Sequence, residues 1–130
     1  MAHPNEDVVR QGYKAFSEGD MDTLRSLFAP DAVHVATGSS QVAGEYNGVD
    51  AILAYYGKLF ELSDGTFRAE LQSVRVEGDD TVVATHRDKG QRGDKTLDQD
   101  EDLTFTISDG KITRLVEKHS DQATYDAFWS

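Results

Sequence analysis

The chain has 130 residues, a pI near 4.6 and a formal net charge of −11 at pH 7, and its length is that of one domain with a buried core. Asp and Glu number 24 against 13 Lys and Arg, so its negative field disfavours nucleic acid and membrane surfaces as partners. The absence of cysteine excludes disulfides, thiolate nucleophiles and sulfur-ligated metals. Because the chain shows neither a basic leader before an apolar run nor an apolar stretch of membrane-spanning length, we expect one cytoplasmic domain over residues 1–130.

Two amphipathic helices joined by a tight corner are predicted at the start of the chain. Asn5 is a candidate N-cap for the first, whose apolar face includes Tyr13 and Phe16 at helical spacing. Asp20 can cap a short second helix that stops at residues 29–31, "APD".

A strand, a loop and a third helix follow. Residues 32–37, "AVHVAT", alternate β-branched and small side chains around His34, which predicts a strand. Residues 38–48 are rich in glycine and predict a loop, and the apolar spacing of residues 49–62 predicts a helix over the core.

Period-two alternation dominates the second half of the chain. A change of parity between Leu71 and Val74 predicts a β-bulge, and residues 81–88 and 101–108 are expected as the next two strands. The polar run between these two strands is expected to be a mobile hairpin tip.

The chain is expected to close with a hairpin and a short helix. Asp109-Gly110 between alternating runs predicts a tight β-turn. Asp121 can cap the terminal helix, whose Phe128 and Trp129 would pack back on the core. Helices first and long strands afterwards indicate a segregated α+β fold.

The order of these elements resembles the nuclear-transport-factor-2-like superfamily, and is closest to its SnoaL-like and ketosteroid-isomerase-like branch. The resemblance rests on residues 8–33, "VVRQGYKAFSEGDMDTLRSLFAPDAV", on 46–60, "YNGVDAILAYYGKLF", and on 107–115, "ISDGKITRL". It implies a cone-shaped, curved antiparallel sheet wrapped around the three helices, a cystatin-like roll, with an apolar pocket and a sheet face that often forms a homodimer. This fold hosts isomerases, cyclases, dehydratases and plain binding domains.

Two carboxylates are candidate proton carriers by this resemblance. Asp102 matches the acid that stabilises an enolate in ketosteroid isomerases, although Leu103 and Phe105 would turn it away from a core on their own side. Asp121 matches approximately the base of SnoaL-like cyclases, and His119 beside it could relay a proton. The alternative is that Asp102 belongs to a solvated acidic run and that Asp121 only caps the last helix.

His34 and His86 lie on strands with small neighbours, which leaves room for an imidazole or a ligand. Scytalone-dehydratase-like members use a histidine pair with an aspartate to eliminate water, so hydration or dehydration is one alternative. A hydrogen-bonded core role is the other. No histidine spacing typical of a metal site occurs, so we expect no metal and no organic cofactor.

Tyr13, Tyr56 and Trp129 are candidate ligand contacts, because large amphipathic side chains commonly line pockets, although each could be plain core. The sequence thus predicts a pocket for a small, largely hydrophobic, carbonyl-containing or polycyclic molecule. An acid–base isomerase or cyclase would use Asp121 or Asp102 with His119 or His34. The rival is a non-catalytic binding or dimerisation domain.

Overall fold

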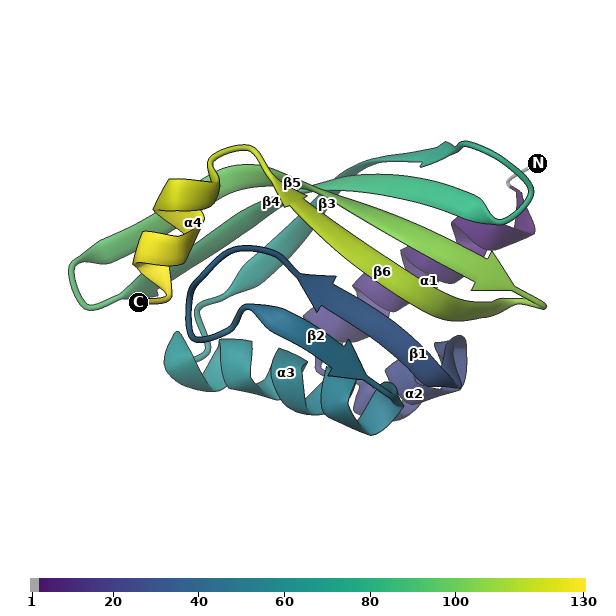
Figure 1. Ribbon diagram of the computed structural model, residues 1–130, viewed down its shortest axis with the longest axis horizontal. Helices are drawn as coiled ribbons and strands as arrows, with labels where there is room; N and C mark the ends of the chain where they lie inside the picture. Colours follow the sequence, from purple (N-terminus) through teal and green to yellow (C-terminus); the bar gives the residue numbers. More distant parts are fainter. Residues whose placement is uncertain (1–2) are drawn as a thin grey trace.

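A curved, unclosed, six-stranded sheet forms the frame of the computed structural model, which describes residues 3–130 (Figure 1). The strands lie in the order β2-β1-β6-β5-β4-β3. All neighbouring pairs are antiparallel except β1 and β6, which are parallel, so the expectation of a wholly antiparallel sheet is wrong in this one pairing. The strands are β1 (Phe28–Ala36), β2 (Gly44–Asn47), β3 (Arg68–Val76), β4 (Thr81–Arg92), β5 (Lys95–Ser108) and β6 (Lys111–His119).

Three helices, α1 (Pro4–Glu18), α2 (Met21–Leu27) and α3 (Val49–Leu62), pack against one side of this sheet, which confirms the expected α+β arrangement (Figure 1). The bounds of α3 are those expected from its spacing. The N-cap of α1 is His3 and not Asn5: the His3 ring accepts a hydrogen bond from the Asn5 backbone N–H, and Pro4 occupies the first turn. Asp20 caps α2 as predicted.

Strand β1 begins earlier than the sequence indicated, at Phe28, and runs through Pro30. The pairing register of β1 with β6 shifts between Phe28 and Val33, and this irregularity accommodates a proline that has no N–H to donate. Strand β2 was not expected at all. It lies in the glycine-rich segment and pairs with the end of β1, where Ala36 faces Gly44.

The expected mobile tip between β4 and β5 is wrong, because both strands continue through it and turn only at Gly93, whose φ is 62°. Alternate residues there face inward, and Gly90 lies close enough to Phe128 that an added Cβ would meet its ring at 3.2 Å. The residues between these inward-facing ones are charged or polar and face the solvent. The alternation of inward and outward side chains was therefore not recognised in the sequence. The bulge in β3 and the Asp109-Gly110 turn are as predicted.

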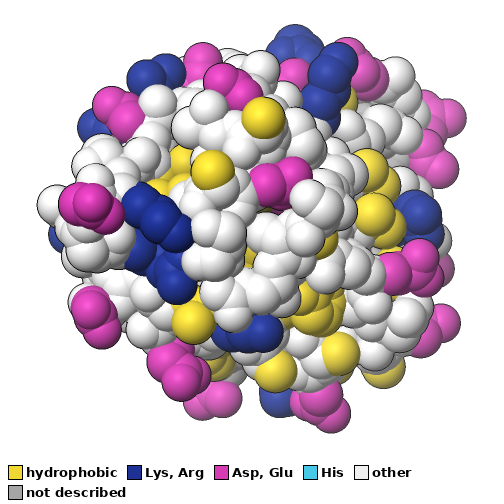
Figure 2. Space-filling model, turned by 60° about the vertical axis from the view of Figure 1, so that its left-hand side comes forward, with side chains coloured by type: hydrophobic (Ala, Val, Ile, Leu, Met, Phe, Trp, Pro, Cys, Tyr) yellow, Lys and Arg dark blue, Asp and Glu magenta, His cyan; other side chains and the backbone are white. Residues whose placement is uncertain are grey.

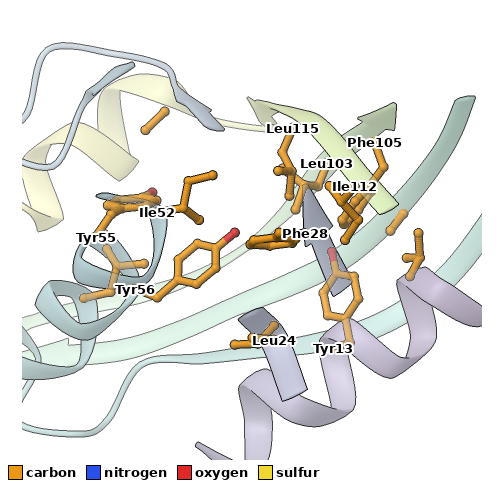
Figure 3. Packing of buried hydrophobic residues seen from close by; sticks show 14 of the residues in the cluster. Tyr13, Leu24, Phe28, Ile52, Tyr55, Tyr56, Leu103, Phe105, Ile112 and Leu115 are labelled. Atoms are coloured by element: carbon orange, nitrogen blue, oxygen red, sulfur yellow. The ribbon is translucent and has the colours of Figure 1, made fainter. Parts of the chain in front are cut away.

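A fourth helix, α4 (Gln122–Phe128), covers the end of the sheet from which the β4–β5 hairpin projects (Figure 1). It is capped by Asp121 as expected, and Phe128 and Trp129 pack into the core. The core fills the space between helices and sheet, with Tyr13 of α1 and Tyr56 of α3 directed into that space (Figure 3).

The surface mixes acidic and basic side chains, and hydrophobic atoms emerge in patches between them on the face drawn in Figure 2. Within residues 3–130, no helix combines the length and apolar character needed to cross a membrane.

Candidate active site

A cavity of about 70 Å³ lies between the helices and the inner face of the sheet. This volume exceeds what one water molecule needs, so the cavity can hold several waters or part of a small organic molecule. Most of its wall is aromatic or aliphatic, and its polar side chains come from four strands and three helices. These polar residues are Tyr13, His34, Tyr55, Tyr56, His86, Asp88, Glu101, Glu117 and Tyr125.

The strand register places three titratable side chains in one row across the sheet. Glu101 of β5 lies directly opposite His86 of β4 on one side and His119 of β6 on the other. The Glu101 Oε1 atom lies 3.4 Å from His86 Nε2 and 3.3 Å from His119 Nδ1. All three side chains are buried, so their charges interact with little screening by water.

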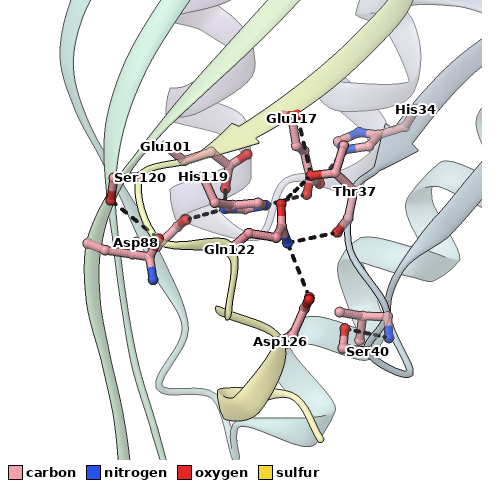
Figure 4. Close-up of polar contacts among 12 residues, drawn as sticks. His34, Thr37, Ser40, Asp88, Glu101, Glu117, His119, Ser120, Gln122 and Asp126 are labelled. Atoms are coloured by element: carbon pink, nitrogen blue, oxygen red, sulfur yellow. Dashed lines mark hydrogen bonds and ion pairs between the residues drawn. The ribbon is translucent and has the colours of Figure 1, made fainter. Parts of the chain in front are cut away.

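Glu117 of β6 is a second polar centre, and its carboxylate accepts three hydrogen bonds. Figure 4 shows Glu117 between His34 and His119. His34 Nε2 lies 2.6 Å from one carboxylate oxygen, which also accepts from the Tyr55 hydroxyl at 2.7 Å. His119 Nε2 lies 2.9 Å from the other oxygen. The remaining ring nitrogen of His34 lies 2.9 Å from the Tyr56 hydroxyl, so every polar atom of that imidazole has a partner.

Tyr13, His86 and Asp88 form a chain of hydrogen bonds that starts on α1 and ends on β4. The Tyr13 hydroxyl lies 2.5 Å from His86 Nδ1, and His86 Nε2 lies 2.9 Å from Asp88 Oδ1. Since the carboxylate of Asp88 can only accept, His86 carries its proton on Nε2 and its Nδ1 accepts from Tyr13. An imidazole held by a carboxylate at one nitrogen and open to a hydroxyl at the other is a typical arrangement for proton transfer.

The two buried glutamates are shifted in opposite directions. Burial raises the pKa of Glu101 well above its ordinary value, and the negative charges of Asp88 and Glu117 raise it further. Burial opposes ionisation of Glu117 too, but the hydrogen bonds from His119 and His34 outweigh it and lower its pKa to about 2. The surroundings therefore favour the protonated, proton-donating form of Glu101 and the ionised, accepting form of Glu117.

The hydroxyl of Tyr13 stays protonated beside these acids. Burial raises its pKa well above the ordinary value of tyrosine, and the charges of Glu101 and Asp88 add to this effect. Tyr13 can therefore donate a hydrogen bond to His86 or to a ligand oxygen across the pH range in which proteins work.

Of the eight residues singled out in the sequence, four line the cavity: Tyr13, His34, Tyr56 and His86. His119 is buried behind the wall, where it stacks on Tyr125 with ring centroids 3.6 Å apart and contacts Glu117 and Glu101. The other three, Asp102, Asp121 and Trp129, lie outside the cavity.

The expectation that Asp102 or Asp121 faces the pocket is wrong. Asp102 points to the outer side of the sheet, where it accepts a hydrogen bond from Thr85, because Leu103 and Phe105 take the inner side. Asp121 is exposed and caps α4, and its pKa is lowered by hydrogen bonds from Thr124. Trp129 is fully buried but packs against Phe67 as core.

Three acids of the site were not among the expected residues: Asp88, Glu101 and Glu117. Each shares the strand parity of inward-facing apolar neighbours, as Glu101 does with Leu103 and Phe105. That parity was the available signal. It was obscured for Asp88 and Glu101 because each lies within a run of charged residues that resembles a solvated face.

Folding also brings together two groups of side chains that spacing alone could not show to be close. His86, Asp88 and Glu101 form one, and Glu101, Glu117 and His119 the other, each with its potential ligand atoms within 4.8 Å of one another. Four of the ligand nitrogens and oxygens in these groups already serve as mutual hydrogen-bond partners. We therefore treat the cluster as a proton-transfer network rather than as a metal centre.

The fold and the cavity together define a class: an α+β cone with a mainly apolar hollow whose inner wall carries paired acids and histidines. A model of the SnoaL-like domain matches residues 9–115, and the chain belongs to this family. An uncharacterized protein of Mycobacterium tuberculosis is 37% identical over 124 residues, which are 95% of each chain.

Two solved structures illustrate how far the likeness extends. Bal32a, from a soil-derived mobile gene cassette, superposes with a TM-score of 0.94 at 37% identity over 98% of this chain and 97% of that one. A putative polyketide cyclase of Sinorhizobium meliloti superposes with a TM-score of 0.72 at 28% identity, over 90% of this chain and 100% of that one.

Proposed function

We propose that this protein is an acid–base enzyme that moves protons on a small, largely apolar carbonyl compound, as an isomerase or a cyclase, without a cofactor. One observation carries the proposal: Glu101 and His86, a protonated acid and a carboxylate-oriented base, lie 3.4 Å apart on the wall of a cavity that is otherwise mainly apolar. Acid–base catalysis usually relies on two titratable groups whose environments push their pKa values apart, so that one is protonated while the other is not. The likeness to a putative polyketide cyclase supports the same chemistry.

The first step in this proposal is removal of a proton from the carbon next to the carbonyl. The Tyr13 hydroxyl turns its proton from His86 to the carbonyl oxygen, which frees His86 Nδ1 to take the carbon-bound proton. The C–H electron pair becomes the enolate, whose oxygen Tyr13 stabilises in a site with little water. Asp88 stabilises the imidazolium through Nε2.

The second step returns a proton to the intermediate. Glu101 donates its proton to the enolate carbon. Nε2 of the His86 imidazolium then reprotonates Glu101 across the 3.4 Å that separates the two groups. One proton leaves the carbon and one returns to it, and Glu101 regains its own. His86 is left protonated on Nδ1, and exchange of this proton through water in the cavity restores the starting Nε2–H form. In a cyclase the enolate would instead attack a second carbonyl of the same molecule before protonation.

Exchange of carbon-bound hydrogen in D₂O tests the proposal without knowledge of the natural substrate. The probe is 4-phenylcyclohexanone, whose protons next to the carbonyl are followed by NMR. We expect the protein to accelerate exchange over buffer, and His86→Gln to reduce that acceleration by about 100-fold or more. Asp102→Asn, a matched acid on the outer side of the same sheet, should leave it unchanged.

The rival class of function predicts a different result. If the wild-type protein binds the ketone but exchanges its protons no faster than buffer, the protein is a non-catalytic binding domain and the proposal is wrong. Hydration or dehydration by His34 and His86 stays a prediction, since both line the cavity but each is held by a different carboxylate, Glu117 and Asp88. The expected homodimer also stays a prediction.

A further inference from the structure

A groove of about 580 Å³ lies outside the cavity, between α1, the end of α3 and the start of β3. The groove and the cavity share wall residues, namely Tyr13, Phe16, Phe67 and Ala69. A molecule that reaches the inner acids from this side therefore passes between these aromatic rings. The groove is thus a candidate entrance to the proposed active site.

The polar rim of this entrance is basic, although the protein as a whole carries a net charge of −11. The charged side chains that line it are Arg10, Lys14, Arg68 and Glu70. Arg10 is paired with Glu6 at 2.9 Å and Glu70 with Lys89 at 3.1 Å, so these charges are compensated.

Lys14 and Arg68 are different, because neither forms an ion pair or a side-chain hydrogen bond with any of residues 3–130. They come from separate elements, α1 and β3, and both line the same hollow. Two uncompensated cations on one groove of an acidic protein form a local site of positive potential, which attracts and orients an anion.

We infer that the substrate is an elongated oxo acid: its carbonyl end enters the inner cavity, its apolar middle passes Phe16 and Phe67, and a carboxylate at its far end pairs with Lys14 and Arg68. This inference rests on the proposed function for the carbonyl end and adds the charge and length of the molecule. The inner wall itself disfavours the carboxylate, because Glu117 is ionised there and would repel it.

Three matched probes test the inference: 4-(4-oxocyclohexyl)benzoate, its primary amide and 4-phenylcyclohexanone. The first two differ in charge but hardly in shape. We expect the carboxylate to bind the wild-type protein about fivefold more tightly than the amide in about 0.02 M NaCl, and this advantage to fade in about 0.5 M NaCl. Lys14→Gln with Arg68→Gln should abolish the advantage and leave binding of the ketone unchanged.

The control removes two positive charges elsewhere. Arg114→Gln with Lys118→Gln changes the outer side of β6, where both side chains are exposed, and should preserve the preference for the carboxylate. Equal affinity for carboxylate and amide in the wild-type protein, or the same loss in both double variants, would overturn the inference.

The two proposals fail in different ways. If the ketone undergoes proton exchange but the carboxylate gains nothing from Lys14 and Arg68, the entrance inference is wrong and the proposed chemistry remains. If the carboxylate binds through the two cations but no probe exchanges protons, the inference holds and the proposed chemistry is wrong.

Discussion

At the scale of single residues, two buried glutamates in one cavity have pKa values shifted in opposite directions because their neighbours differ. Glu117 accepts hydrogen bonds from two histidines and a tyrosine, whereas Glu101 faces Asp88 and has no comparable set of donors. The fold stabilises the ionised form of one and the neutral form of the other. The stability of the protein should therefore depend on pH through each of them with opposite sign.

Glu101→Gln should stabilise the protein, increasingly so as the pH rises from about 5 to about 8. The folded-state pKa of Glu101 is raised, so its contribution to stability is fully present below the unfolded-state pKa and is lost as the pH rises toward the folded value. Gln keeps the shape and cannot ionise. We expect a gain of about 1 to 3 kcal/mol at pH 8 in the free energy of unfolding, measured by urea denaturation.

Glu117→Gln is the matched control and should behave oppositely. The folded-state pKa of Glu117 is lowered to about 2, so its stabilising contribution is present above the unfolded value and is lost as the pH falls toward the folded one. The Gln variant should therefore be less stable than wild type at pH 7 and approach it near pH 3. Stability changes of the same sign in both variants would contradict the assignment of the two acids.

The same residues show what the sequence could and could not predict about the site. Parity spoke against Asp102 on the inner side, although Asp102 was kept as a candidate, and applied one residue earlier it would have placed Glu101 inside. Glu101 lies beside His86 and His119 only because of the register in which three strands pair. This register cannot be read from the sequence pattern of any single strand. Of the polar residues that line the cavity, the sequence singled out His34, His86, Tyr13 and Tyr56.

At the scale of elements, the Arg92 side chain is one of several polar groups that attach α4 to the rest of the fold. The Arg92 guanidinium at the end of β4 donates to the backbone carbonyls of Leu62, Phe128 and Ser130, and thereby links the ends of α3 and α4. It also lies 5.9 Å from the centre of the Trp129 ring. The helix that closes one end of the cone is therefore held by polar contacts as well as by its apolar residues.

Arg92→Ala should loosen α4. Three backbone carbonyls lose a charged donor, so we expect the free energy of unfolding to fall by about 1.5 to 3 kcal/mol. Trp129, the single tryptophan and fully buried, should become more accessible to acrylamide quenching of its fluorescence. Arg87→Ala is the control, because Arg87 pairs with Asp98 and Asp100 on the outer side, where surface pairs contribute less than about 1 kcal/mol. Equal quenching in both variants would contradict this role of Arg92.

At the scale of the whole molecule, the order of the elements was predictable and their extent was not. Alternating helix and strand periods identified the three core helices and the long strands, because each period reflects one buried face. Strand β2 was not predicted because its four residues are rich in turn formers and show no alternation of polar and apolar side chains. They form a strand only by pairing with β1. The parallel pairing of β1 with β6 joins segments about 80 residues apart in the chain. It likewise depends on the whole fold and could not be predicted from either segment alone.

The net charge of −11 is also a property of the whole molecule, and it should make stability depend on salt. Folding brings 24 acidic and 13 basic side chains closer together, and the excess of like charges destabilises the compact state. Raising NaCl from about 0.02 M to about 0.5 M shortens the screening length to a few ångströms, so we expect Tm to rise by roughly 2 to 5 °C in differential scanning calorimetry. Glu18→Gln with Glu45→Gln removes two exposed charges that form no ion pair within residues 3–130, and should shrink this rise. A fall in Tm with salt would mean that the ion pairs of the surface outweigh its net repulsion.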